Sequence, residues 1–419
     1  MRRPVPAVLA QHVADAAVLR NTRSLLVRAP HVRLHQLARL DERLAAHLDG
    51  IAVAGDVGAR LVQAALENPQ SAEVFVAGVG AIEGRDPAAL ERLFALVEAL
   101  PGSRAGLASA FGWVQGASLR GITQKLLQSP GVLQRQMGLS ACGMHGVDPG
   151  DAFLDAALRD GSPALRATGL RVAAQMGKVE WLGRCVAAID DEDAGCSAEA
   201  ARAATLLGNR GRALTALQHA LLTAGPQQQG ALDLLLKIGP PADTRAVIGT
   251  LAEDATMARP LIRGIGVAGD PHFLPWLVRR MSDPSFARLA GESFSAITGA
   301  DLARDDLESD APPDFVSRPS DDPEDDDTSM DGDDGLPWPD AEKVADWLER
   351  HGHRFATGTR CWMGEVPTRA HALGVLHHGF QRQRSAAATY LCLLQPGTPL
   401  FNTAAPAGRQ QAWLRAMAP

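Results

Sequence analysis

The sequence is poor in aromatic residues and in cysteine. Aromatic residues make up 5% of the 419 positions, with a single tyrosine, whereas hydrophobic residues as a whole make up 46%. A core must therefore be built mainly from alanine, leucine, valine and isoleucine, which suits thin, closely packed helices and argues against an aromatic-rich β-sandwich. The five cysteines are far apart, odd in number and without a CxxC pair, which disfavours both a disulfide framework and a structural zinc site. Reduced thiols in a cytoplasm fit this pattern best.

Long apolar runs are also absent. No stretch of about 18 uncharged apolar residues occurs, so a membrane-spanning helix is not expected. The first 20 residues are basic and then apolar, but two prolines, a histidine and an aspartate interrupt the apolar part. We interpret this start as part of a cytoplasmic protein and not as a secretory signal.

Motifs of the common catalytic and nucleotide-binding sites are missing too. The sequence contains no GxGxxG after a strand, no GxxxxGK[ST], no HExxH and no GxSxG. A C-terminal region rich in histidine also contains Cys361 and Glu365, but its spacings do not match those of zinc ligands. Its histidines are His351, His353, His371, His377 and His378. We predict that the protein is not an enzyme and has no catalytic residues, cofactor or metal.

Charge is distributed unevenly along the chain, whose formal net charge is −7. Residues 301–340 hold 16 acidic and two basic side chains, whereas the rest of the chain carries a net +7. The stretch 321–335 has no apolar periodicity and repels itself, which is typical of a solvated linker. We predict a disordered acidic linker at 301–335. The alternative is an acidic tether that folds back onto a basic face and competes with an acidic ligand.

An internal repeat indicates the fold. Apolar helical stretches that end in a glycine and continue into a short polar turn recur at intervals of 27–34 residues. The glycines are Gly80, Gly112, Gly143, Gly177, Gly208, Gly239, Gly266 and Gly299. This spacing predicts pairs of short helices, each closed by its glycine, which are stable only when neighbouring pairs stack and bury a shared face.

The stretch 151–177 illustrates one such unit. The first helix has an apolar face, and the second is predicted to begin at Pro163, a residue suited to the first turn. Gly177 provides the left-handed stop. The apolar face of the first helix is Leu154, Ala157 and Leu158, and that of the second is Leu165, Thr168, Val172 and Met176. We place Val172 at the seam between stacked units.

Aspartate and arginine recur at equivalent positions of these units. Asp160 and Asp283 lie in the turn between the two helices, and Arg166 and Arg288 each precede their closing glycine by eleven residues. In this respect the units resemble the HEAT repeat, in which a turn aspartate and a second-helix arginine stack along the array. We interpret them as an intramolecular ladder between adjacent turns; a ligand-binding role for the arginines is the alternative.

Two flanks differ from the repeats. An apolar stripe of Leu34, Leu37, Leu40 or Asp41, Leu44 and Leu48 predicts an amphipathic helix that caps the open end of the array or, alternatively, docks a partner. After the acidic segment, aromatic residues concentrate, and we predict a small helical module. The predicted fold is therefore an all-α, HEAT-like α-solenoid, with an N-terminal extension and capping helix at 1–55, repeats at 56–300, the linker at 301–335 and the C-terminal module at 336–419.

Three pieces of the chain carry a resemblance to one bacterial family. They are LHQLARLDERLAAHLDG at 34–50, the central array, and a C-terminal part with LPWPD, HRFATGTRCWMG and GFQRQRSAAATYLCLLQPGTPLF. The chain resembles HEAT-repeat proteins of proteobacteria that are encoded near type VI secretion genes, beside effectors and thiolase-like proteins. The resemblance implies a cytoplasmic adaptor that binds an effector or a thiolase-like partner before loading onto the secretion spike.

Binding by surface shape is the mechanism expected of such a scaffold. A stack of helix pairs exposes a long concave face made from its second helices, and arginine and tryptophan are common anchors of protein interfaces. The candidate contacts are Arg171, Arg202, Arg263, Arg279 and Arg280, with Trp276, Trp347 and Trp362. Packing inside the core is the alternative for each tryptophan.

Two other functions are weighed against the adaptor. Some DNA glycosylases consist of HEAT-like repeats with a basic concave groove, but here the arginines are spread over all units and the acidic segment opposes the approach of phosphate. A HEAT-like DNA-binding or repair protein is the main alternative. A lyase for bilin chromophores has only an analogy of fold in its favour.

Overall fold

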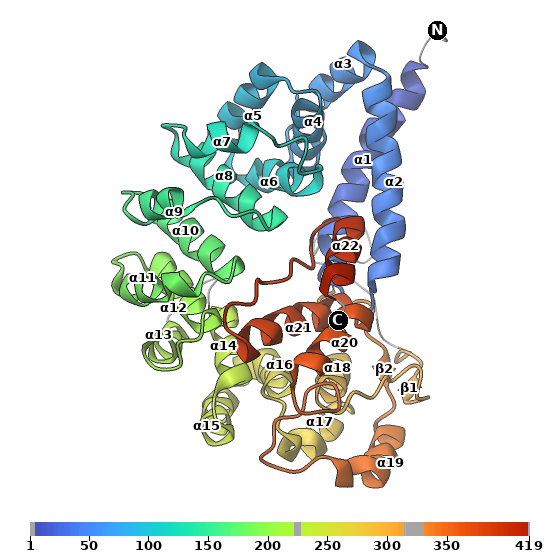
Figure 1. Cartoon of the computed structure of the whole chain (residues 1–419). Helices are drawn as coiled ribbons and strands as arrows, with labels where there is room; N and C mark the ends of the chain where they lie inside the picture. Colours follow the sequence, from blue (N-terminus) through green and yellow to red (C-terminus); the bar gives the residue numbers. More distant parts are fainter. Residues whose placement is uncertain (1–4, 222–227, 314, 316–330, 418–419) are drawn as a thin grey trace. The chain divides into compact units, whose positions relative to one another are not determined.

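The computed structural model describes residues 5–221, 228–313, 315 and 331–417, which are mainly helical (Figure 1). Within them the chain forms 22 α-helices and one antiparallel pair of two-residue strands, β1 (Glu308–Ser309) and β2 (Trp338–Pro339). The predicted all-α class is confirmed. Backbone packing divides the chain into two compact units: unit 1 comprises 1–213 and 374–419, and unit 2 comprises 214–373.

Unit 1 begins with two long helices and continues with pairs of shorter ones. Its helices are α1 (Pro6–Leu26), α2 (Leu34–Val53), α3 (Asp56–Ala65), α4 (Ser71–Glu83), α5 (Pro87–Ala99), α6 (Arg104–Trp113), α7 (Ile122–Leu127), α8 (Val132–His145), α9 (Asp151–Leu158), α10 (Pro163–Gln175), α11 (Leu182–Ala187), α12 (Ala194–Leu206), α21 (Gln381–Leu394) and α22 (Ala407–Met417). Two further helices, α13 (Arg212–Leu221) and α20 (Arg369–His378), cross the boundary between the units.

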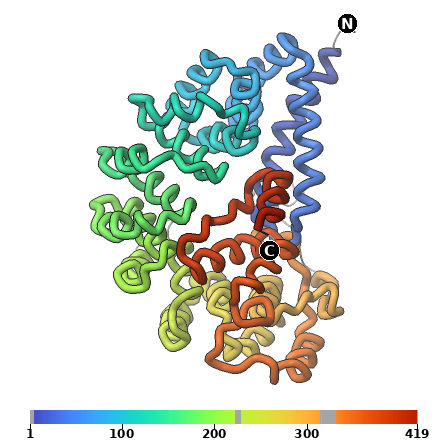
Figure 2. The backbone as a smooth tube through the Cα atoms, viewed as in Figure 1, coloured from blue at the N-terminus to red at the C-terminus, as the bar shows by residue number. Residues whose placement is uncertain are grey.

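The second members of these pairs form a row. In order along the chain, α4 packs on α6, α6 on α8, α8 on α10 and α10 on α12. The first members, α5, α7, α9 and α11, each pack on the helix that completes their pair. The backbone trace in Figure 2 can be followed along this row. Each of the inner second helices, α6, α8 and α10, therefore has a neighbour about one repeat earlier and another about one repeat later.

Unit 2 has the same arrangement with three second helices. Its helices are α14 (Gln228–Ile238), α15 (Pro241–Ala252), α16 (Ala258–Ala268), α17 (Leu274–Arg280), α18 (Ala287–Thr298) and α19 (Ala341–His351). Here α14 packs on α16 and α16 on α18, while α15 and α17 lie against the second helices that follow them. Residues 336–373 belong to unit 2 and 374–419 to unit 1, so the region predicted as one C-terminal module is divided between the units.

Short 3-10 turns join several of these helices. They are η1 (Pro101–Ser103), η2 (Val179–Trp181), η3 (Ala188–Asp190), η4 (Ala255–Met257), η5 (Pro271–Phe273) and η6 (Gly352–Arg354). Of these, η1 and η5 begin with a proline, and η4 follows an aspartate that caps it. All three lead directly into the first turn of an α-helix. Such tight turns are common at the ends of α-helices.

The pair formed by α9 and α10 matches the unit predicted from the sequence. The helical structure is interrupted between α9 and α10, and Pro163 is the first residue of α10. Leu154, Leu165 and Val172 are at most 1% exposed, which confirms the predicted apolar faces. Gly177 follows α10 with a φ of 68°, the left-handed conformation expected of a helix stop. Local sequence signals therefore define this pair.

The predicted role of the repeating glycines is only partly confirmed. Gly177, Gly208 and Gly299 have φ values of 68°, 109° and 72° at the ends of α10, α12 and α18. Gly239 follows the end of α14 without a positive φ. The other four lie inside helices, where the predicted stop is wrong: Gly80 in α4, Gly112 in α6, Gly143 in α8 and Gly266 in α16.

Close packing between second helices explains three of these four internal glycines. A Cβ on Gly143 would lie 3.4 Å from Cγ2 of Val172 in α10, and one on Gly266 would lie 2.9 Å from Cα of Ser293 in α18. Gly112 approaches α8 in the same way. The interval of about one repeat therefore recurs at these positions because each second helix needs a small residue where the next one approaches, and not because the helix ends there.

Alanine substitutions test this explanation. Gly266→Ala is expected to lower the free energy of unfolding by about 1–3 kcal/mol, because the added methyl group would overlap the backbone of Ser293. Gly80→Ala is the matched control, since this glycine is also inside a helix but has nothing within 4 Å of its Cβ position. Alanine at position 80 should raise the free energy of unfolding by about 0.5–1 kcal/mol. Chemical denaturation measures both values, and effects of the same sign would contradict the explanation.

The amphipathic helix predicted at the N-terminal flank is α2, and its apolar stripe is buried within unit 1. All of the predicted stripe residues are buried: Leu34, Leu37, Leu40, Asp41, Leu44 and Leu48. The helix packs against α1, α3, α4 and α22. The alternative in which the stripe docks a partner is wrong, because the chain's own helices cover it. One of these, the 21-residue α1, was not predicted.

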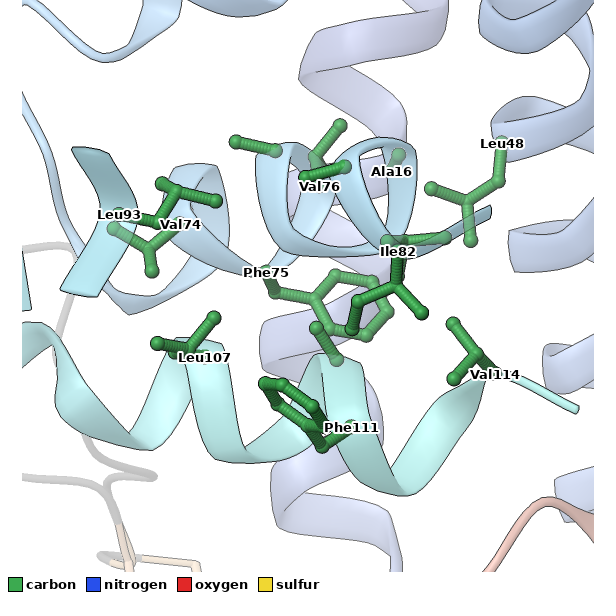
Figure 3. Packing of buried hydrophobic residues seen from close by; sticks show 14 of the residues in the cluster. Ala16, Leu48, Val74, Phe75, Val76, Ile82, Leu93, Leu107, Phe111 and Val114 are labelled. Carbon is green, nitrogen blue, oxygen red and sulfur yellow. The ribbon is translucent and has the colours of Figure 1, made fainter. Parts of the chain in front are cut away.

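The core of this region continues from the long helices into the first pairs. Figure 3 shows Ala16 of α1 and Leu48 of α2 beside Ile82 of α4, with Phe111 of α6 below them. These side chains belong to one buried cluster that reaches from α1 to α8. Each fully buried aliphatic or aromatic side chain of this kind stabilises the fold by about 1.5–3 kcal/mol. The long helices and the first pairs thus fold around one core.

The C-terminal part of unit 1 bonds to the ends of the second helices. Arg409 of α22 donates to three carbonyl oxygens at the end of α6, at 2.7–3.3 Å. The side chain of Asn402 donates to the carbonyl of Met144 in α8 at 3.3 Å. The N–H of Leu400 donates to the carbonyl of Gln175 in α10 at 2.9 Å. The last carbonyl groups of a helix lack partners within the helix. This segment satisfies them and covers these helix ends.

Candidate functional site

The predicted ladder of aspartate and arginine is present in unit 1. Arg135 of α8 pairs with Asp160 at 3.0 Å, and Arg166 of α10 makes two bonds of 2.7 Å to Asp191. The two arginines are 31 residues apart, and so are the two aspartates. The second helices α8 and α10 therefore each bond to the turn of the pair that follows. The interpretation of Asp160 and Arg166 as structural residues is confirmed.

The bond between Arg166 and Asp191 makes stability depend on pH. The hydrogen bonds from Arg166 hold the pKa of the Asp191 carboxyl well below its usual range. A lowered pKa stabilises the fold at pH values above the ordinary pKa of about 4, and this contribution is lost as the pH falls below it. Asp191→Asn is therefore expected to lower the free energy of unfolding at pH 7 by about 1.5–3 kcal/mol.

Denaturation of the wild type and of Asp191→Asn between pH 7 and pH 3 measures this dependence. The difference between the two proteins should stay constant down to about pH 5 and shrink below about pH 4, where the unfolded carboxyl binds a proton. A difference that is as large at pH 3 as at pH 7 would contradict the role given to the charged carboxylate.

The second predicted pair, Asp283 and Arg288, does not form a rung of the ladder. The carboxylate of Asp283 accepts a hydrogen bond from the N–H of Ser285 at 3.0 Å. Arg288 is buried and donates to the carboxylate of Asp331 at 2.6 Å and to the carbonyl of Asp333 at 3.2 Å. The prediction for this pair is wrong, because Arg288 bonds to the acidic segment and not to an adjacent turn.

The described ends of the acidic segment pack against other residues of unit 2, to which the segment itself belongs. Asp333 is 4% exposed and accepts a bond from Arg259 of α16. The guanidinium of Arg288 lies 4.8 Å and 4.7 Å from the ring centres of Phe315 and Trp338, a favourable cation–π arrangement. At the other end, Leu302 and Leu307 are buried. A disordered linker over the whole of 301–335 is therefore wrong at both ends; residues 314 and 316–330 lie outside the described part of the chain.

Two of the predicted partner contacts lie side by side in unit 1. Arg171 of α10 is 3.4 Å from Glu199 of α12, and Arg202 of α12 is 2.7 Å from the same carboxylate. Arg171 is exposed and Arg202 is half-buried. An exposed ion pair of this kind contributes little to stability. Arg171 can therefore exchange its long contact with Glu199 for one with a partner at little cost in stability.

The other predicted contacts lie in unit 2. Arg263 of α16, and Arg279 and Arg280 of α17, are exposed, and the guanidinium of Arg280 lies 4.9 Å from the ring of the half-buried Trp276. Trp362 is 5% exposed and packs against a histidine ring. The core alternative holds for Trp362, which has too little exposed surface to anchor a partner.

Trp347, the remaining predicted contact, lines a cavity of about 510 Å³ in unit 2. Its ring stacks on His351 with ring centres 4.4 Å apart, and it meets Phe294 edge-on at 5.6 Å. The cavity is lined by Thr298, Gly299, Ala300, Arg304, Asp305, Trp347, Arg350, His351, Arg354, Met363, Gly364 and Glu365. Several charged side chains therefore meet at one hollow of the surface.

Three arginines that were not predicted as site residues, Arg304, Arg350 and Arg354, line this cavity. Arg350 lies in the last turn of α19 and Arg354 ends η6, and both line the cavity with Trp347, whereas Arg304 follows α18 more than forty residues earlier. The spacing of Arg350 and Arg354 around His351 is a weak signal, since an exposed helix end commonly carries basic residues. Only the fold brings Arg304 to them.

The cysteines have the properties of core residues. All five are buried and have free thiols. Burial raises the pKa of Cys142 to about 11 and those of Cys185 and Cys392 to about 12. A thiol must lose its proton to act as a nucleophile or metal ligand. These three thiols are therefore protonated and unreactive at neutral pH.

In 5–221, 228–313, 315 and 331–417, no cluster of three or more histidine, cysteine, aspartate or glutamate side chains could hold a metal ion. The helices in these same ranges include none with the length and apolar character needed to cross a bilayer.

Comparisons of the chain with protein-family models, characterised proteins and solved structures give no match.

Proposed function

We propose that the chain is a cytoplasmic, non-enzymatic protein-binding scaffold built as a HEAT-like α-solenoid. The observation that supports this most strongly is the row of second helices from α4 to α12, in which Arg–Asp pairs that recur after 31 residues link α8 and α10 to the turns of the pairs that follow them. Such a row presents side chains at regular intervals over a long surface. That geometry suits the binding of an extended or domain-sized partner.

The partner proposed is a type VI secretion effector, a thiolase-like protein, or both. This proposal rests on the resemblance of the N-terminal, central and C-terminal pieces of the sequence to adaptors encoded beside such proteins. The surface offered to the partner includes Arg171 on α10 and, separately, Arg279 and Arg280 on α17. Arginines of this kind commonly anchor interfaces through bonds to carboxylates and carbonyl groups.

Co-purification from the native host, with mass spectrometry of bound proteins, tests the proposal. The wild type should recover a secretion effector or a thiolase-like protein, and Arg171→Ala or the double variant Arg279→Ala/Arg280→Ala should recover less. Arg159→Ala is the matched control, because Arg159 is exposed directly after α9 and bonds to Asp155 of that helix. Full retention of the partner by both Arg171→Ala and Arg279→Ala/Arg280→Ala would contradict the contact residues. Recovery of nucleic acid in place of either protein class would contradict the adaptor role.

A further inference from the structure

The cavity beside Trp347 is formed by four segments of unit 2. The end of α18, the turn at 304–305, the end of α19 with η6, and residues 363–365 all contribute to its lining. Its volume of about 510 Å³ lies within the range of about 300–1,000 Å³ typical of small-molecule sites. The stacked rings of Trp347 and His351 form part of the wall, and Nδ1 of His351 donates to the carbonyl of Trp347 at 2.8 Å. That bond fixes the imidazole ring in place.

The charges of the lining leave an excess of positive charge. Asp305 accepts bonds from Arg304 at 3.0 Å and 3.3 Å, and Glu365 lies 3.4 Å from His371. Burial alone would raise the pKa of Asp305, but the bonds from Arg304 and the backbone lower it below its usual value. Both acidic groups of the lining therefore already have partners, and its three arginines outnumber its two carboxylates.

Two arginines of the lining have no carboxylate partner among the described residues. Nε of Arg350 donates to the carbonyl of Asp346 at 3.1 Å, and the guanidinium of Arg354 lies 5.6 Å from the ring of Phe355. Neither contact neutralises a charge. Two guanidinium groups at one cavity match the charge of a dianion, and their planar donors suit the oxygen atoms of a phosphate.

The nearby end of α18 does not cancel this attraction. The carbonyl end of a helix carries partial negative charge and would repel an anion. Here the carbonyls of Ala296 and Ile297 accept bonds from the N–H groups of Met363 and Gly364, at 2.7 Å and 3.0 Å. Because these oxygens are occupied, the guanidinium groups dominate the electrostatics of the opening.

We propose that this cavity is a binding site for a phosphate monoester, held by Arg350 and Arg354. A phosphate monoester carries about −1.5 to −2 charge at neutral pH, which the two unpaired guanidinium groups balance. The phosphate belongs either to a small molecule or to a phosphorylated side chain of a protein, and both present the same group to the arginines. The site is independent of the protein-binding surface proposed above.

Isothermal titration of the full chain with two probes tests the site. The probes are phenyl phosphate and a short peptide with one phosphoserine, each compared with its unphosphorylated form. Saturable binding of a phosphorylated probe is expected, weakened about tenfold or more in Arg350→Ala/Arg354→Ala. Arg60→Ala/Arg92→Ala, which removes two exposed arginines outside the cavity and outside the proposed protein-binding surface, is the matched control and should bind as the wild type does.

The outcomes separate the two sources of phosphate. Tighter binding of phenyl phosphate assigns the site to a small molecule, and tighter binding of the phosphopeptide assigns it to a modified protein. The proposal is overturned if neither probe binds, if the unphosphorylated forms bind equally well, or if the Arg350→Ala/Arg354→Ala variant keeps wild-type affinity. Thermal unfolding of both double variants confirms that they are folded, which is expected because all four arginines are exposed.

Discussion

Val172→Asp is expected to lower the free energy of unfolding of unit 1 by about 3–5 kcal/mol, as the burial of an unpaired charge does. Val172 is 1% exposed in α10, and its Cγ2 atom is 3.4 Å from the Cβ position of Gly143 in α8. An aspartate carboxylate at this buried position would lose its contact with water. Urea denaturation followed by circular dichroism measures the change.

A neighbour on the same helix provides the control for Val172→Asp. Arg171→Ala removes an exposed side chain whose ion pair with Glu199 is long, at 3.4 Å, and it should change the free energy of unfolding by less than about 1 kcal/mol. Equal stability of Val172→Asp and the wild type would place Val172 outside the packing between α8 and α10.

Arg384→Ala should have an effect of similar size, about 3–5 kcal/mol, because it leaves several buried polar groups without partners. Arg384 is fully buried in α21, where it donates to the carbonyl of Leu376 at 2.8 Å, to Gln410 at 2.7 Å and to Gln381. Burial lowers the pKa of Arg384 to about 10, so the guanidinium is still charged at neutral pH. Denaturation with guanidinium chloride measures the loss.

The control for this substitution is Ser385→Ala, an exposed position on the same helix, which should change stability by less than about 0.5 kcal/mol. Arg384→Lys adds a second comparison, because it keeps the charge but cannot make all three bonds. If Arg384→Lys were as stable as the wild type, the three directed hydrogen bonds would not explain the burial of this side chain.

Local signals in the sequence were sufficient to predict the helix pair at 151–177. Its apolar spacing, Pro163 at the start of α10 and Gly177 after its end are each read over a few residues, and each has one usual physical meaning. The structural roles of Asp160 and Arg166 in the ladder were predicted for the same reason. The all-α class follows from the recurrence of such stretches, so it too was within reach of the sequence.

The role of the other glycines could not be predicted in this way. Some of these glycines end a helix and others make room for a neighbouring helix, but both kinds follow apolar stretches that look alike in the sequence. Only the position of the next helix distinguishes Gly177 from Gly143. Arg288 was misassigned for a similar reason, since its partners Asp331 and Asp333 lie more than forty residues away. The cavity beside Trp347 combines segments from 298 to 365, and no short motif joins them.

Hydrogen exchange of the native protein, compared with that of Val172→Asp, tests the central claim that the second helices form a row of mutually dependent neighbours. In such a row, damage to one member spreads first to those that touch it. We predict faster exchange in α8, α10 and α12, with α1, α2 and the helices of unit 2 unchanged. Faster exchange confined to α10, or equally fast throughout the chain, would contradict the claim.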